Sequence, residues 1–75
     1  MIPLTLAVPG KYKIVRIEIP GAVRKLSNLG IFVGDVIEVI KPAPGPVIFK
    51  KGESRIGIGF GIAMNVIVIP VKEIK

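Results

Sequence analysis

The side chains that most often perform catalysis or bind transition metals are scarce in this sequence. Histidine and cysteine are absent, which removes the commonest general base, the thiolate nucleophile and two preferred ligands of transition metals. The carboxylates are dispersed and form no pair or metal cluster by spacing: Glu18, Asp35, Glu38, Glu53 and Glu73. No evident base activates the hydroxyls of Thr5, Ser27 and Ser54. We therefore expect no enzyme, no catalytic residue, no cofactor and no tight metal site.

Basic residues outnumber acidic ones, 11 to 5, which gives a net charge of +6. Such a balance favours an anionic partner, which could be nucleic acid, a membrane surface or an acidic protein. Five of the cations fall on a predicted helix and around a predicted turn at Gly52: Arg24 and Lys25, then Lys50, Lys51 and Arg55. The aromatic residues form no stacking series: Tyr12, Phe32, Phe49 and Phe60. We therefore expect no nucleic-acid partner. A small basic nucleic-acid-binding barrel is the alternative function.

A glycine-rich run occupies residues 57–61, where Gly57, Gly59 and Gly61 alternate with Ile58 and Phe60. The run is not a dinucleotide-binding fingerprint, because it lacks a following helix of useful length and the surrounding βαβ unit. Glycines at period two leave one strand face bare. Such a face either lets a barrel strand bend or lets another backbone or a bulky side chain approach closely.

The elements that must position these residues are short strands. Alternating and β-branched residues predict strands over 11–19, 35–41, 47–51, 54–60 and 66–71, with a helix over 22–29 and a helical turn over 61–65. Residues 1–10 read as an extended lead-in, on which Leu4 and Leu6 would share a face. Five strands with turns about every ten residues predict a single all-β domain over 1–75, a small, partly open barrel.

Two features of the sequence bear on location. The longest uncharged run, residues 56–71, is short of the ~20 residues that a spanning helix needs. The first residues lack the basic start of a signal peptide, so we expect a cytoplasmic protein.

The segment over 26–40 has the most specific pattern. Gly30 stands where a helix end needs a left-handed residue, and Gly34 with Asp35 indicates a tight turn. The helix is expected to bury Val23, Leu26 and Leu29 as one stripe. Between the two glycines lie three consecutive apolar residues that are not all expected to point inward: Ile31, Phe32 and Val33. They therefore suit either a packed loop or a contact with a partner.

The order and spacing of these residues resemble a FeoA domain over essentially the whole chain. The most specific part is Leu-x-x-Leu-Gly-x-x-x-Gly-Asp, formed by Leu26, Leu29, Gly30, Gly34 and Asp35. Weaker matches in the same order flank it: Gly10, Ile17, Gly21 and Arg24 before it, and Ile37, Val39, Gly45, Gly52, Ile56, Ala63, Val66 and Val68 after it. Val33 departs from the family, which often has proline there.

The resemblance implies an SH3-like barrel that serves as a small cytosolic adaptor and regulator of ferrous-iron uptake. Its implied partner is the cytosolic part of a FeoB-type membrane permease, through which the protein would be peripheral to the membrane. A homo-oligomer is a further possibility. No DNA-binding segment precedes the domain, so we expect the free-standing form rather than a metalloregulator. The expected partner-binding residues are Arg24, Lys25, Leu29, Ile31, Phe32 and Val33.

Overall fold

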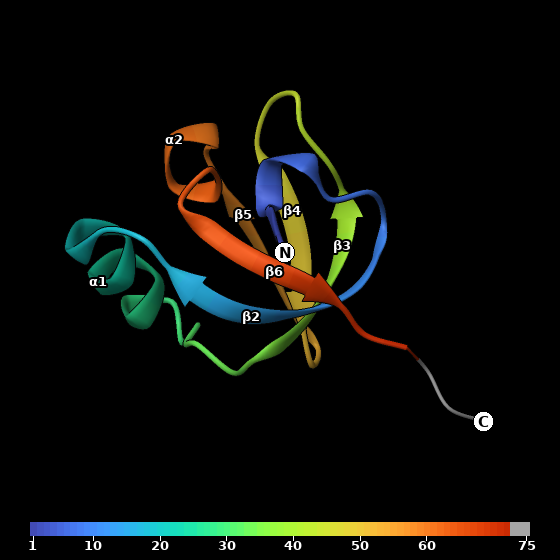
Figure 1. Ribbon diagram of the computed structural model, residues 1–75, viewed down its shortest axis with the longest axis horizontal. Helices are drawn as coiled ribbons and strands as arrows, with labels where there is room; N and C mark the ends of the chain where they lie inside the picture. Colours follow the sequence, from blue (N-terminus) through green and yellow to red (C-terminus); the bar gives the residue numbers. More distant parts are fainter. Residues whose placement is uncertain (73–75) are drawn as a thin grey trace.

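The computed structural model describes residues 1–72, which form an antiparallel sheet of six strands in the order β1-β6-β2-β3-β4-β5. The sheet curls into a partly open barrel, and α1 lies at one side of it (Figure 1). The elements in chain order are β1 (Ile2–Pro3), η1 (Leu4–Leu6), β2 (Gly10–Ile17), α1 (Pro20–Asn28), β3 (Val36–Lys41), β4 (Val47–Lys51), β5 (Ser54–Ile58), α2 (Phe60–Ala63) and β6 (Val66–Pro70).

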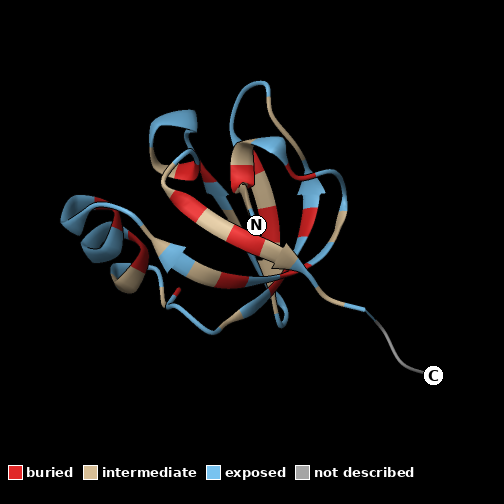
Figure 2. Ribbon diagram, in the orientation of Figure 1, coloured by how far each residue is buried: buried red, intermediate tan, exposed pale blue. Residues whose placement is uncertain are grey.

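Alternate residues of the strands fill the barrel, as the period of two in the sequence predicts. The largest of the fully buried side chains is Phe49 on β4, and the other strands contribute mostly isoleucine and valine. Figure 2 shows buried positions alternating with more exposed ones along the strands. The strand residues of this core are Tyr12, Ile14, Ile37, Val39, Val47, Phe49, Ile58, Val66 and Val68. The predicted all-β, SH3-like fold is therefore confirmed.

The N-terminal segment differs from the extended lead-in that the sequence indicates. A short strand, β1, pairs with β6 and adds a sixth strand to the five expected. The chain then turns through η1, a single 3-10 turn. Because a turn rotates successive side chains about its axis, Leu4 is buried while Leu6 is exposed. The expectation that these two leucines share a face was wrong.

Helix α1 begins at Pro20, two residues earlier than predicted, because proline is suited to the first helical position. Its buried residues are Ala22 and Leu26, four apart, which form a narrow stripe on the core side. Val23 and Leu29 are each 45% exposed. The predicted stripe was therefore wrong in two of its three members, and Leu29 is available at the surface.

The other boundaries are close to those expected. β4 has the predicted bounds, whereas β2, β5 and β6 end one or two residues earlier than the sequence suggests. The predicted helical turn is α2, which begins at Phe60 directly after Gly59. Among the described residues, no helix is long and apolar enough to cross a membrane.

Candidate functional site

The end of α1 is a Schellman motif, which fixes the direction of the loop that follows. The N–H of Gly30 donates to Ser27 O at 3.0 Å, and the N–H of Ile31 donates to Leu26 O at 2.8 Å. These two bonds satisfy carbonyls that the helix itself leaves unpaired. Gly30 has φ +81°, as its position in the sequence predicts. The chain therefore leaves the helix in one defined direction.

Ile31 corrects one expected partner contact. Its side chain is only 1% exposed and lies in the core with Leu26. The physical reason is the motif itself, in which the second residue after the helix packs against the residue three before the helix end. Of the three apolar residues between the glycines, Ile31 therefore belongs to folding.

Phe32 and Val33 are the two residues that remain outside. Phe32 is 52% exposed and Val33 is 57% exposed. They begin a tight turn in which the N–H of Asp35 donates to Phe32 O at 3.1 Å, and Gly34 takes the positive φ, +98°. A positive φ at the third residue is the arrangement of a type II turn. The turn presents two neighbouring apolar side chains to solvent.

Lys51, from the end of β4, holds this turn in place. Its Nζ lies 2.8 Å from Asp35 Oδ2 and donates to Gly30 O at 2.7 Å. The same ammonium lies 5.7 Å from the centre of the Phe32 ring, within the range of a cation–π contact. The N–H of Phe32 in turn donates to Asp35 Oδ2 at 2.9 Å. We call Lys51, Asp35, Gly30 and Phe32 the lysine clasp.

The clasp sets the ionisation of Asp35. Partial desolvation acts to raise the pKa of its carboxyl, but the Lys51 hydrogen bond, the Phe32 N–H and the Lys51 charge together outweigh this and lower the pKa. The carboxylate is therefore held in its charged form in the folded protein. The folded state binds the Asp35 proton only at a lower pH than the unfolded chain does.

Acid is expected to destabilise the protein through Asp35. Because the folded pKa is depressed, this contribution is present above the unfolded pKa and is lost as the pH falls through the folded pKa. The Asp35 contribution is expected to disappear over the acidic range in which the pH falls from the ordinary pKa of an aspartic acid through the lowered pKa of the folded state. Urea unfolding of wild type and Asp35→Asn across this range measures it as the difference between the two curves. Glu53→Gln, which removes an exposed acid from the β4–β5 turn, should reproduce the wild-type slope; equal slopes for wild type and Asp35→Asn would contradict the assignment.

Of the remaining predicted contact residues, Arg24 and Lys25 lie on α1, and Leu29 caps its end next to this loop. Arg24, Lys25 and Leu29 line one side of a shallow hollow of about 370 Å³, together with Gly21 and Asn28. The structure thus brings together two cations and one half-exposed leucine on the outer face of the helix, which is largely exposed in Figure 2. We call Arg24, Lys25, Leu29, Phe32 and Val33 the helix–loop surface.

The described residues offer little for other kinds of site. Over residues 1–72, no group of three or more carboxylates, histidines or cysteines lies close enough to hold a metal ion. Tyr12 and Phe49 are buried in the core. The exposed rings of Phe32 and Phe60 belong to separate segments, the 30–35 loop and α2, which lie apart in Figure 1. They cannot form one stacking platform for bases.

Comparison with known proteins agrees with this architecture. The family profile described as FeoA domain matches residues 2–70. A protein of Methanocaldococcus jannaschii named "Putative Fe(2+) transport protein A" is 40% identical over 70 residues, which span 91% of this chain and 85% of the relative. The crystal structure of an iron uptake regulatory protein, FeoA, is 34% identical and covers 91% of this chain and 93% of its own, with a TM-score of 0.74.

Two more distant structures share the fold alone. A FeoA-like protein from Clostridium acetobutylicum is 23% identical with a TM-score of 0.80, and covers 99% of this chain and 91% of its own. The manganese regulator SloR is 12% identical with a TM-score of 0.85, over 93% of this chain and 34% of its own. The fold defines a small SH3-like barrel domain that occurs both alone and within a longer chain. The chain studied belongs to the FeoA family.

Lys51 is the residue of this site that sequence reasoning missed. It was assigned only to a basic group around Gly52, whereas its contacts are 16 and 21 residues away, with Asp35 and Gly30. No local spacing encodes such a contact. The sequence signals the Asp35 side of the clasp, an Asp next to a turn glycine, but not the lysine that meets it.

Proposed function

We propose that this protein is an accessory and regulatory component of ferrous-iron uptake, and that it acts by docking on the cytosolic part of a FeoB-type permease. The family assignment and the name of its 40% identical relative support a role in ferrous-iron uptake. The docking step is inferred from the helix–loop surface. The function is regulatory contact, without bond chemistry on this chain.

The observation that carries the proposal is the pre-organised exposure of Phe32 and Val33. The Schellman motif and the lysine clasp hold both ends of their loop, so two apolar side chains are presented without a large loss of backbone freedom on binding. An ordered aromatic anchor of this kind is typical of binding hot spots. Arg24 and Lys25 line a hollow with Leu29 on the preceding helix and suit an acidic rim on the partner.

A matched pair of phenylalanine variants tests the docking surface. Phe32 and Phe60 have nearly equal exposure, 52% and 54%, and belong to separate segments that lie apart in Figure 1, the 30–35 loop and α2. Phe32→Glu is expected to weaken binding to the purified cytosolic part of the permease by at least about tenfold, because a charge replaces the aromatic side chain that the interface would bury. Phe60→Glu is expected to bind within about twofold of wild type. Biolayer interferometry measures both.

The outcome is readable because both variants change an exposed residue and should stay folded. Circular dichroism and the unfolding midpoint establish this before binding is compared. Equal affinities of Phe32→Glu and wild type would contradict docking through the helix–loop surface. Loss of binding only in Phe60→Glu would move the contact to the α2 end of the barrel.

A further inference from the structure

Strand β5 is the long open edge of the sheet. It lies at the end of the strand order and pairs with β4 alone among the described residues. The other edge, β1, is two residues long and ends in proline. Open edges of this length normally pair or carry protection, because their unpaired N–H and C=O groups accept another strand. The sequence leaves β5 unusually bare.

The hairpin geometry shows which backbone groups of β5 are available. Gly52 and Glu53 form a two-residue turn that joins β4 to β5, and only Gly52 has positive φ, +60°. In such a hairpin the closing pair, Lys51 and Ser54, is hydrogen-bonded, and hydrogen-bonded pairs then alternate along the ladder. Arg55 and Gly57 fall in the intervening pairs. Their N–H and C=O groups therefore point away from β4, into the open edge.

Gly59 is the N-cap of α2, a position that suits glycine, but neither a left-handed backbone nor crowding accounts for the glycines of this segment. Gly57, Gly59 and Gly61 have no positive φ. A Cβ at Gly57 would only touch Ile48 Cγ1 at 3.8 Å, and none would meet anything within 4 Å at Gly59 or Gly61. β5 pairs with β4 in continuous register, without a bulge that a glycine would serve. The sequence suggests two roles for these glycines, bending of the strand and close approach of another group. Of these, we favour close approach of a group from outside the chain.

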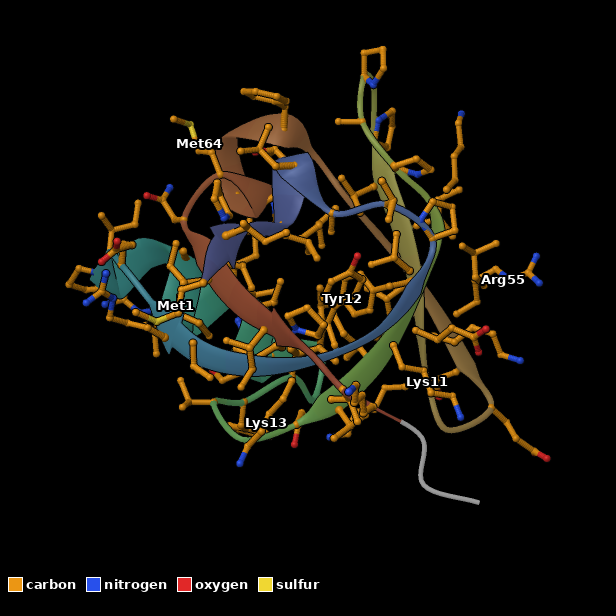
Figure 3. All side chains as sticks on the ribbon, turned by 45° about the vertical axis from the view of Figure 1, so that its right-hand side comes forward. Met1, Lys11, Tyr12, Lys13, Arg55 and Met64 are labelled. Carbon is orange, nitrogen blue, oxygen red and sulfur yellow. The ribbon has the colours of Figure 1, made fainter. Side chains whose placement is uncertain are left out.

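The charges beside the open edge of β5 favour an acidic partner. Lys11, Glu38, Lys50 and Arg55 are paired across four strands, so they share the outer face, three cations to one acid. Neither Lys50 nor Arg55 has an ion pair within the described residues. Arg55 extends away from the barrel into solvent (Figure 3). A shallow hollow of about 260 Å³ opens beside Lys50 on this face.

We propose that the free edge of β5 binds an extended acidic peptide segment of a partner by strand addition. The backbone groups of Arg55 and Gly57 bond the added strand. In antiparallel pairing, a carboxylate of the peptide lies opposite Arg55. A large apolar side chain two residues before it covers Gly57 and contacts Ile48, the same rescue of a strand glycine that cross-strand aromatics provide.

A second copy of this chain fits the edge less well. Self-pairing of β5 would bring together two chains that each carry a net charge of +6, with both Arg55 side chains on the same face. An acidic segment meets complementary charge instead. The site is separate from the helix–loop surface, so it does not depend on the docking proposed above.

The probe is an acetylated octapeptide in which a Tyr-x-Glu motif is set in a background of alternating Thr and Ser. The comparison peptide is identical but carries Lys in place of Glu. Titration of ¹⁵N-labelled wild-type protein up to ~1 mM peptide is expected to shift the amides of Arg55 and Gly57. The Glu peptide should bind at least about tenfold tighter than the Lys peptide at low salt. Arg55→Glu should reverse this preference.

Gly57→Pro separates strand addition from charge attraction. Proline removes the outward N–H but no bond to β4, so the fold and the unfolding midpoint should be retained. Binding of the Glu peptide is expected to fall at least about tenfold in Gly57→Pro, and to fall less in Gly57→Ala, which keeps the outward N–H and only narrows the bare face. Docking on the permease through Phe32 is a separate measurement, so failure of one proposal leaves the other readable.

Four outcomes would overturn the assignment. The first is the absence of any amide shift with the Glu peptide, and the second is unchanged binding in Gly57→Pro. The third is a change of the β5 amide shifts with protein concentration in the absence of peptide, which would identify a second copy of this chain as the occupant. The fourth is an equal response of the same amides to a single-stranded oligonucleotide, with affinity that falls steeply with salt, which would identify a nucleic-acid edge.

Discussion

Replacing Ile31 with glutamine is expected to lower the free energy of unfolding by about 3 kcal/mol, because an apolar core contact is lost and an amide is buried without partners. Ile31 is 1% exposed and packs in the same core as Leu26, directly after the helix end. A domain of this size has only about 4–11 kcal/mol of stability in total. The substitution should therefore remove a large part of it.

Phe32→Gln is the control for Ile31→Gln, since it introduces the same side chain one residue further along the same loop. Phe32 is half exposed, and its replacement is expected to change the free energy of unfolding by about 1 kcal/mol or less, chiefly through its contact with Lys51. Urea unfolding followed by circular dichroism compares the two variants. Similar stabilities of the two would mean that Ile31 is not a core residue.

The second large effect is expected at Lys51. Lys51→Met keeps the apolar part of the side chain but removes the ion pair to Asp35, the hydrogen bond to Gly30 O and the contact with the Phe32 ring. The side chains of Lys51 and Asp35 are 38% and 21% exposed, so solvent screens the pair. We expect a loss of about 2 kcal/mol of unfolding free energy for the three contacts together.

Lys51→Met should also make the loop over residues 30–35 more mobile. Hydrogen exchange of the Phe32 amide, which donates to Asp35 Oδ2, is expected to become faster in Lys51→Met than the loss of global stability alone explains. Lys50→Met, one residue earlier on β4 and without an ion pair in the described chain, is the matched control. Unchanged exchange at Phe32 in Lys51→Met would show that Asp35 holds the loop without the lysine.

The fold could be predicted from local patterns because strands of this barrel are short and bounded by Gly and Pro. β4 between Pro46 and Gly52 is the clearest case, with bounds that the sequence gives correctly. The helix stripe failed for a geometric reason. Leu29 follows the helix end and Val23 lies off the line joining Ala22 to Leu26, so a helix of two to three turns buries fewer residues than its apolar spacing suggests.

Only part of the candidate site could be predicted from the sequence, for a different reason. Gly30 predicts the helix end, and the same motif predicts that Ile31 turns inward, but this second step requires reading the two residues together. The lysine clasp joins Asp35, directly before β3, to Lys51 at the end of the neighbouring strand β4, and such a pair is fixed by tertiary structure alone. The exposure of Phe32 and Val33 follows only once both are known.

The position of β6 has a consequence for how the protein is made. Strand β6 lies between β1 and β2, and pairs Pro70 with Tyr12 and Val68 with both Ile2 and Ile14. The hydrogen bonds of β1, and those along one edge of β2, therefore cannot form until β6 has been made. Ribosome-bound nascent chains that end before Val66 lack this strand entirely, so their barrel stays open on this side. Such dependence on distant pairings is typical of slowly folding β topologies.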